Sequence, residues 1–166
     1  MTAKEYNNCV ACSAADVMRF AVRCGGRRED CEDAVQEALA SLWSHHGSVD
    51  AARGKSYLLS AVYRRLMSHF RHCAVVQEYA TDVMATSSED CRPNNSFDIR
   101  DAIEQSLRVL PEVQRAILQL RDVEGYSYAE IGETLGLSDK QVQVYLFRAR
   151  VTMRKQLNLL GYGKDQ

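Results

Sequence analysis

The sequence predicts an all-α protein made of two small helical domains joined by a flexible linker. Apolar residues recur at helical spacing through most of the 166 residues, and no stretch alternates like a β-strand for more than a few residues. A polar stretch at 81–95 has no apolar period and holds one of the two prolines. These observations predict a first domain at 1–78, a linker at 79–97 and a second domain at 98–166.

Length and composition exclude several other classes of protein. The chain is 46% apolar and 26% charged, which is typical of a globular protein and not of a disordered or fibrous one. The longest apolar stretches, such as residues 57–63, are far shorter than the ~20 residues of a membrane helix. The first residues also lack the charged head and apolar core of a secretory signal. We therefore expect a cytoplasmic protein with no membrane association.

Three helices are predicted in the first domain, at 14–24, 30–45 and 55–72. Paired glycines end the first helix, and Gly47 ends the second. The second helix carries a wide apolar stripe, from which we expect Leu39, Leu42 and Trp43 to hold the domain core. The third carries the apolar positions Leu58, Leu59, Val62, Leu66 and Phe70.

The second domain contains the signature of a helix-turn-helix. A helix at 97–109 is followed by Pro111, which begins a further helix that runs to about residue 121. Ser127-x-x-Glu130 and Ser138-x-x-Gln141 are two capping boxes, and Gly136 stands at the turn between the helices that they begin. We expect Ala129 to provide the close approach between these two helices, and the last helix to run from 139 to about 159.

Charge is strongly segregated along the chain although the net charge is only −1. Residues 29–37 hold five acids and no base, and residues 51–77 hold five bases and no acid. Residues 101–139 carry a net charge of −5, and residues 140–164 carry six bases and no acid. Two basic stretches, each beside an acidic one, predict two surfaces that bind a polyanion.

The last helix has the pattern of a recognition helix. One predicted buried stripe consists of Val142, Leu146, Ala149, Met153 and Leu157. The side chains left outward near the helix start, where base edges would be contacted, are Lys140, Gln141, Gln143, Tyr145 and Arg148. Further cations suited to phosphate contacts are Arg150, Arg154 and Lys155. The alternative is a helical hairpin with a purely structural role.

A second apolar stripe on the same helix has no assigned role. It consists of Val144, Phe147 and Val151, on roughly the opposite face from the buried stripe. Either it packs on the helix at 112–121, or a partner protein covers it.

The six cysteines are expected to be reduced thiols in a chain without an export signal. We interpret Cys24, Cys31 and Cys73 as small buried hydrophobic residues. The alternative is a zinc site drawn from Cys9, Cys12, His69 and His72, but neither pair has zinc-finger spacing. We therefore expect no metal and no cofactor.

The motifs of both halves resemble those of one family. The sequences LPEVQRAILQL at 110–120, GYSYAEIGETLGLS at 125–138 and FRAR at 147–150 resemble the fourth conserved region of bacterial RNA polymerase sigma factors. EDAVQEALASLW at 32–43 resembles the second region. Only these two regions are present, which is the layout of the extracytoplasmic-function (ECF) group of the sigma-70 family, and the resemblance covers about residues 8–160.

The resemblance implies a factor that binds core RNA polymerase and directs it to promoters by recognising −10 and −35 elements. It implies contacts with the polymerase β′ clamp coiled coil by Asp33, Gln36, Glu37 and Ser41. It implies −10 contacts by Arg53, Lys55, Tyr57, Arg64, Arg65, Ser68 and Arg71, with Tyr63 as a further base-stacking candidate. It implies −35 contacts by Ser138, Lys140, Gln141, Gln143, Val144, Tyr145, Arg148, Arg150 and Lys155. The implied partners are core polymerase through its β′ clamp and β flap, promoter DNA, and an anti-sigma factor.

Some positions depart from the family pattern. Tyr57 stands where members usually have Trp, and Arg64 stands where an Asn is common. In the recognition helix, Gln143 and Tyr145 replace two cations. Gln can bond adenine through two hydrogen bonds, so base reading is retained while affinity from charge is expected to be lower. No family promoter sequence is therefore transferred to this chain.

Parts of the sequence also fit two other functions. A stand-alone helix-turn-helix regulator would need the second domain alone and would have no use for the core-docking helix at 32–43. A thiol- or zinc-responsive regulator would use the cysteines and histidines named above. No enzyme is expected, because the sequence has no glycine-rich phosphate loop, nucleophile motif or paired carboxylates in a pocket-like setting.

Overall fold

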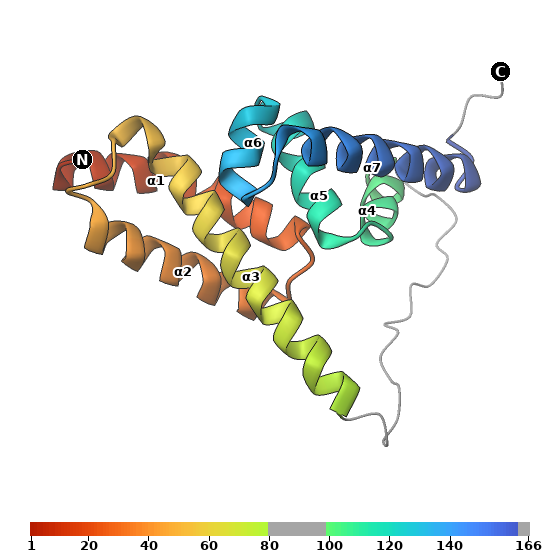
Figure 1. The fold of residues 1–166 in the computed structure, drawn as a ribbon, viewed down its shortest axis with the longest axis horizontal. Coiled ribbons are helices and arrows are strands. Elements are labelled where there is room, and N and C mark those ends of the chain that lie inside the picture. The colour runs from red at the N-terminus through yellow and green to blue at the C-terminus, as the bar shows by residue number, and fades with distance from the viewer. Residues whose placement is uncertain (80–98, 163–166) are drawn as a thin grey trace.

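The structure is a computed structural model that describes the backbone of residues 1–79 and 99–162. Every regular element in these two ranges is a helix, so the all-α prediction is confirmed (Figure 1). Apart from residue 79, the linker expected at 79–97 lies outside the described residues. The elements are α1 (Ala3–Arg23), α2 (Arg28–His45), η1 (Ala51–Arg53), α3 (Gly54–Tyr79), α4 (Ile99–Arg108), α5 (Glu112–Leu118), η2 (Gln119–Val123), α6 (Tyr128–Leu135) and α7 (Asp139–Leu159).

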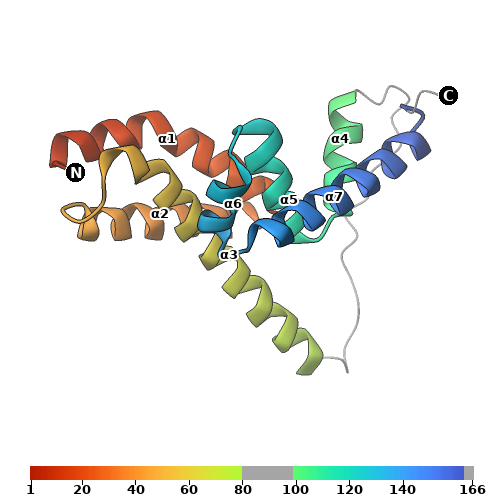
Figure 2. The same cartoon turned by 45° about the horizontal axis from the view of Figure 1, so that its top comes forward.

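Helices α1, α2 and α3 pack together around a shared apolar core. The largest fully buried side chains of this part are Val17, Phe20, Leu42, Leu58, Leu59, Val62 and Leu66. Helix α1 is longer than predicted, because a capping box formed by Thr2 and Glu5 starts it at Ala3. Helix α3 extends past α1 and α2 at its C-terminal end (Figures 1 and 2).

The prediction that Trp43 lies in the core is wrong. Its side chain is 47% exposed, and it contacts the Tyr6 ring edge-on at 4.9 Å and stacks on His46 at 4.8 Å between ring centroids. The buried face of α2 is narrower than the sequence suggested and ends at Leu42. One residue further along an α-helix is a rotation of about 100°, which turns Trp43 away from the core.

The predicted helix-turn-helix is confirmed in α6 and α7. Both capping boxes form, at Ser127 and at Ser138, and Gly136 takes the left-handed conformation at the turn with φ +71°. Of the predicted buried stripe on α7, Val142, Leu146 and Ala149 are buried, while the two positions nearer the C-terminus are half-buried.

The close approach between these helices comes from Gly132 and not from Ala129, which is exposed. A Cβ atom on Gly132 would lie 2.6 Å from the carbonyl oxygen of Leu137. The backbone between α6 and α7 therefore passes directly over Gly132, and only a residue without a side chain fits there.

The two halves of the chain form one continuous core. Helix α6 lies across the start of α3, and α5 lies against the end of α1 (Figures 1 and 2). Arg23 donates a hydrogen bond of 2.9 Å to the buried Gln119 of η2. The guanidinium of Arg115 covers Gly25, whose φ of +100° and lack of a Cβ allow that contact.

We expect Gly132→Ala to destabilise the protein by about 1–2 kcal/mol, even though alanine favours a helix more than glycine does. The new methyl group would push against backbone, which cannot rotate away. Thermal or urea unfolding followed by circular dichroism measures the effect. Gly47→Ala is the control, since no atom lies within 4 Å of the added Cβ. An equal effect of the two substitutions would contradict the role given to Gly132.

Candidate nucleic-acid and polymerase interfaces

A polar stripe runs along one face of α3. Tyr57, Ser60, Arg64, Ser68 and Arg71 follow one another at steps of three and four residues, which places them on one side of the helix. Arg64, Ser68 and Arg71 are exposed, and Tyr57 and Ser60 are half-buried. We call these five residues, together with Arg53 just before the helix, the α3 stripe.

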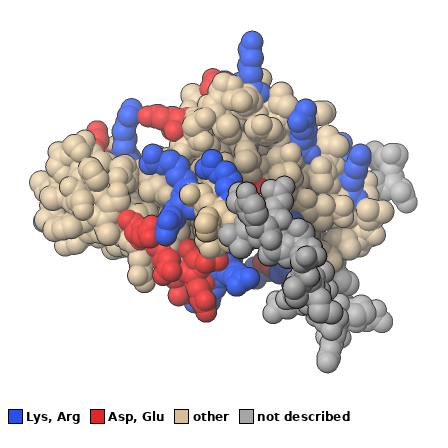
Figure 3. Space-filling model, turned by 60° about the horizontal axis from the view of Figure 1, so that its bottom comes forward, with Lys and Arg blue, Asp and Glu red and all other residues tan. Residues whose placement is uncertain are grey.

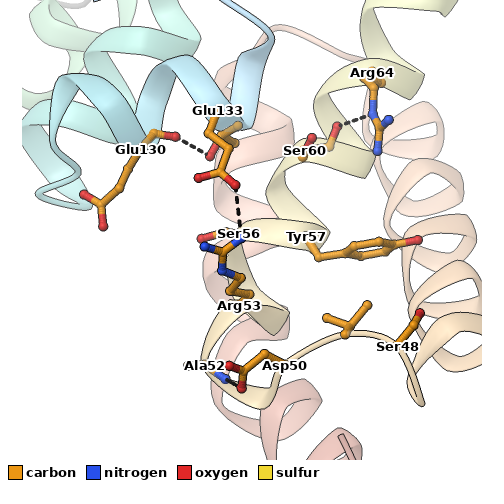
Figure 4. Close-up of a pocket in the computed structure, with 12 residues that line it drawn as sticks. Ser48, Asp50, Ala52, Arg53, Ser56, Tyr57, Ser60, Arg64, Glu130 and Glu133 are labelled. Carbon is orange, nitrogen blue, oxygen red and sulfur yellow. Dashed lines mark hydrogen bonds and ion pairs between the residues drawn. The ribbon is translucent and has the colours of Figure 1, made fainter.

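The N-terminal part of the α3 stripe, from Arg53 to Arg64, borders a cavity of about 660 Å³ (Figure 4). The first half of the chain contributes residues between 48 and 64, and α6 contributes Glu130, Glu133 and Thr134. Figure 4 shows the Tyr57 ring crossing this space from α3. The cavity thus combines an aromatic ring and two cations, Arg53 and Arg64, with the three carboxylates of Asp50, Glu130 and Glu133.

Tyr57 is fixed in place by a contact with α2. Its hydroxyl lies 2.8 Å from the hydroxyl of Ser41, and its ring packs against the core. Ser41, which the sequence assigned to the polymerase surface, is therefore turned toward α3. This contact orients the Tyr57 ring from outside the cavity.

Two of the cations assigned to the −10 element lie off the stripe. Lys55 Nζ lies 2.7 Å from Asp16 of α1 and 2.6 Å from Glu124, which precedes α6. Arg65 lies 2.8 Å from Glu37 of α2. The structure thus separates Lys55 and Arg65 from the stripe and gives each an acidic partner.

The Lys55 contact is the more enclosed of the two. Its side chain is 31% exposed and that of Glu124 is 10% exposed. Burial disfavours the charged ammonium, but the hydrogen bonds to both carboxylates outweigh burial and raise the pKa of Lys55. The same contact holds the pKa of Asp16 below its usual value.

Tyr63 is not available for base stacking. Its side chain is 7% exposed, and burial raises the pKa of its hydroxyl to about 12. It lies inside α3's buried face, near Cys24 of the first half and Tyr145 of α7. The prediction of a second stacking group is therefore wrong.

The polar face of α2 is open to solvent. Asp33, Gln36 and Glu37 are all exposed, as a docking surface requires. Figure 3 shows acidic side chains gathered on one part of the molecule with basic ones beside them, so the charges form no single uniform surface. We call Asp33, Gln36 and Glu37 the α2 acidic face.

At the start of α7, the structure divides the predicted base-reading residues into two groups. Lys140, Gln143, Val144 and Arg148 are exposed. The side-chain oxygen of Gln141 is already bonded to the backbone N–H and the hydroxyl of Ser138, at 2.9 and 3.0 Å, so only its NH₂ group remains for a base. Tyr145 is half-buried against the core.

The cations further along α7 also differ. Arg150 lies 2.6 Å from Asp122, whose hydrogen bond raises the pKa of the guanidinium. Arg154 and Lys155 are exposed.

The second apolar stripe does not pack on α5, since the exposed fractions of Val144, Phe147 and Val151 are 46%, 69% and 36%.

The alternative zinc ligands do not come together. Cys9 lies against Gly54 at the start of α3, while His69 lies on the same helix 15 residues further on, roughly 22 Å away. Within the described ranges, no group of three or more His, Cys, Asp or Glu side chains is placed to hold a metal. Cys24 and Cys31 are buried as expected, and burial raises the pKa of Cys24 to about 12, but Cys73 is exposed.

Comparison with known families decides the class of the protein. Residues 9–74 match sigma-70 region 2, and residues 100–153 match sigma-70 region 4. Both matches are to regions of sigma-70 factors. The region 2 match covers the first half, so the interpretation as a stand-alone helix-turn-helix regulator is not supported.

Named relatives agree along most of the chain. It is 31% identical over 153 residues to the ECF RNA polymerase sigma factor SigL of Mycobacterium tuberculosis, covering 89% of this chain and 86% of SigL. The chain belongs to the ECF sigma factors. It is 27% identical over 139 residues to the ECF sigma factor SigF of Caulobacter vibrioides, covering 83% and 76%. It is also 28% identical over 137 residues to the sigma-E factor of Escherichia coli, covering 73% and 70%.

A solved structure shares the fold. The sigma factor RpoE from Bartonella quintana, crystallised with the anti-sigma factor NepR, superposes with a TM-score of 0.77. The match covers 93% of this chain and 98% of RpoE at 18% identity. Together these comparisons show that the protein is a sigma factor that directs promoter-specific transcription initiation.

Sequence reasoning missed the acids that meet the basic residues. Asp16, Glu124 and Glu133 were not singled out, although they pair with Lys55 and Arg53. For Glu124 and Glu133, the one signal in the sequence was the net charge of −5 over residues 101–139. No periodicity within the chain shows which of those acids reach α3.

Within the described ranges, no helix is long and apolar enough to span a membrane.

We expect Gln143→Ala to cost ~1–3 kcal/mol of binding free energy at particular base pairs of duplex DNA. Lys155→Ala should instead weaken binding to all sequences about equally and lower the salt dependence by roughly one phosphate contact. Competition binding over a duplex library at two salt concentrations measures both. Equal weakening of every sequence by Gln143→Ala would contradict its place on the reading face.

Proposed function

We propose that this sigma factor recognises a promoter at two points while a third surface binds core RNA polymerase. In this proposal the α3 stripe contacts the −10 element, and the start of α7 contacts the −35 element. The α2 acidic face binds the β′ clamp coiled coil. In this proposal, residues 1–78 bind core polymerase and the −10 element, and residues 98–166 bind the −35 element. A linker at 79–97 sets the spacing between the two domains.

The arrangement of the α3 stripe carries this proposal. Arg53 lies just before α3, and Arg64 and Arg71 lie along one face of it, so the three cations are spread along a line that a single strand could follow through its phosphates. The cavity beside Tyr57 offers an aromatic surface next to two of these cations. A base that leaves the stack of a melting duplex needs such an aromatic surface, and its phosphate needs a cation nearby. The six residues of this stripe, all neutral or cationic, therefore suit a melted strand better than an intact duplex.

The two remaining −10 candidates take a different role in the proposal. Lys55 and Arg65 are each held by carboxylates of neighbouring helices. They position α1, α2 and α3 relative to one another and reach DNA only if those contacts break. Ser41 likewise acts by orienting Tyr57.

At the −35 element, the exposed side chains near the start of α7 lie in the major groove in this proposal. Gln143 has an uncommitted amide and reads a base edge through two hydrogen bonds. Val144 contacts a thymine methyl group, and Ser138 caps the helix whose N-terminus faces the DNA. Arg148 and Lys155 bind phosphates and set the register.

The proposed partners are core RNA polymerase through its β′ clamp and β flap, promoter DNA, and an anti-sigma factor. Support for the last comes from the structurally similar RpoE, which was crystallised with the anti-sigma factor NepR. The protein acts by binding and has no catalytic centre of its own in this proposal. Its place of action is where these partners meet, the bacterial cytoplasm.

Replacing the carboxylates of the α2 acidic face tests the polymerase contact. Asp33→Asn with Glu37→Gln removes two charges that would bond clamp arginines, and we expect at least about tenfold weaker binding to bacterial core polymerase. Titration of labelled core polymerase with the purified chain, followed by transcription from genomic fragments, measures the loss. Little effect on folding is expected, because the Glu37–Arg65 pair is more than half exposed.

Asp101→Asn with Glu104→Gln is the control, since it removes two exposed carboxylates from α4. Unchanged polymerase binding in the α2 variant would overturn the assignment of this face. Absence of any polymerase complex with the unaltered chain would overturn the proposed function as a whole.

A further inference from the structure

We propose that Cys73 is a modification site, where a low-molecular-weight disulfide forms a mixed disulfide that weakens the docking of core RNA polymerase. The site is a cluster of three side chains. Cys73 and His69 lie toward the C-terminal end of α3, and Asp30 lies in the first turn of α2. The inference rests on the proposed polymerase contact of the α2 acidic face and adds a means of regulating it.

The three side chains meet at one nitrogen of the His69 ring. Sγ of Cys73 lies 3.3 Å from Nε2 of His69, which stands one helical turn earlier on α3. A carboxylate oxygen of Asp30 lies 3.5 Å from the same nitrogen. In the part of the chain that the structure describes, no set of three or more such groups is placed to hold a metal. The cluster therefore suits thiol chemistry rather than a zinc ion.

The contact gives the thiol a base. The thiol of Cys73 donates its proton to Nε2 of His69, and the carboxylate of Asp30 balances the positive charge that the ring gains. The thiolate attacks one sulfur of the disulfide, so that a new S–S bond forms and the old one breaks. The other half of the reagent leaves as a thiolate and takes the proton from the ring. The Cys73 sulfur is oxidised and the departing sulfur is reduced, so the disulfide is the only oxidant needed.

Cys12 and Cys73 are the two exposed cysteines that the structure describes. Cys24 and Cys31 are buried, out of reach of a reagent in water. Cys12 also has a polar neighbour one turn earlier on its helix, but that neighbour is Asn8, whose amide oxygen lies 4.0 Å from the thiol. An amide oxygen accepts a hydrogen bond without taking up the proton. Cys12 is therefore a matched control within the same chain.

The row of α3 residues that contains Cys73 lies beside α2. Arg65 lies 2.8 Å from Glu37, and His69 lies 3.5 Å from Asp30, so the two helices run in opposite directions here. Cys73 follows at the next step of four residues in the same row. The thiol is thus placed near the end of α2 from which the α2 acidic face begins.

A modified Cys73 can cover part of that face. The step from His69 to Cys73 is about 6 Å along α3, and the step from Asp30 to Asp33 is about 4.5 Å along α2. A glutathionyl group is a tripeptide, and three extended residues reach roughly 10 Å, enough to extend over Asp33. Its own carboxylates would compete with Asp33 and Glu37 for the arginines of the clamp.

The rates of mixed-disulfide formation test the site. The full chain is treated with glutathione disulfide, and peptide mass spectrometry of quenched samples measures the modified fraction of each cysteine over time. We expect Cys73 to react at least about tenfold faster than Cys12, because the imidazole takes up its proton. His69→Gln should bring the two rates together. His72→Gln is the control, since it makes the same change at the exposed neighbouring histidine.

Binding to core polymerase tests the consequence. In a titration with labelled bacterial core polymerase, the glutathionylated chain should bind at least about threefold more weakly than the reduced chain, and dithiothreitol should restore binding. Cys73→Ser should keep its affinity after the same treatment, whereas Cys12→Ser should still lose it. Circular dichroism checks that each variant and the modified chain are folded.

The outcomes separate this inference from the proposed function. Equal rates at Cys73 and Cys12, or a Cys73 rate unchanged by His69→Gln, overturn the site. Fast modification of Cys73 that leaves polymerase binding unchanged overturns its effect on docking. If the reduced chain forms no complex with polymerase, the proposed function fails, while the two rates still decide whether the thiol site exists.

Discussion

The ammonium group of Lys55 is the contact on which the arrangement of the two halves depends. It is bonded by Asp16 from α1 and by Glu124 from the segment before α6. Glu124 is almost covered, and a carboxylate with so little access to water needs a cation beside it. Because Lys55 satisfies both acids at once, it joins α1, α3 and the second half at a single point. The position of α6, and with it Glu133, follows from that junction.

Helix α3 has to serve two surfaces, and its core face sets the position of the other. Leu58, Leu59, Val62 and Leu66 are fully or almost fully buried, so the rotation of the helix about its axis is fixed by packing. The α3 stripe then projects from the opposite side of the helix. Ser41 adds the one restraint that the stripe itself needs, by holding Tyr57 beside the cavity. A rigid helix therefore presents the groups proposed to bind a flexible strand.

The sequence predicted local features well and contacts between distant segments poorly. Capping boxes and the turn at Gly136 depend on residues within four positions, so their residue types were enough to predict them. Of the two acidic partners of Lys55, Glu124 lies 69 residues away, and no pattern in either segment connects the two. Tyr63 and Tyr57 are both tyrosines on α3, and only packing shows that Tyr63 is buried. The prediction for Trp43 was wrong for a related reason. An apolar side chain can lie at the edge of a buried stripe, and the residue type does not show where that stripe ends.

The polar contacts between the two halves differ in how far water reaches them. The Arg53–Glu133 pair is exposed and easily screened, whereas the Lys55–Glu124 pair is largely covered. At the junction with α1, the Nε atom of Arg115 is buried and has no hydrogen-bond partner among the described residues. Such a group costs about 1–3 kcal/mol of folding free energy, which the packing around it has to offset. The contact region between the halves therefore combines ion pairs that are satisfied with one buried polar group that is not.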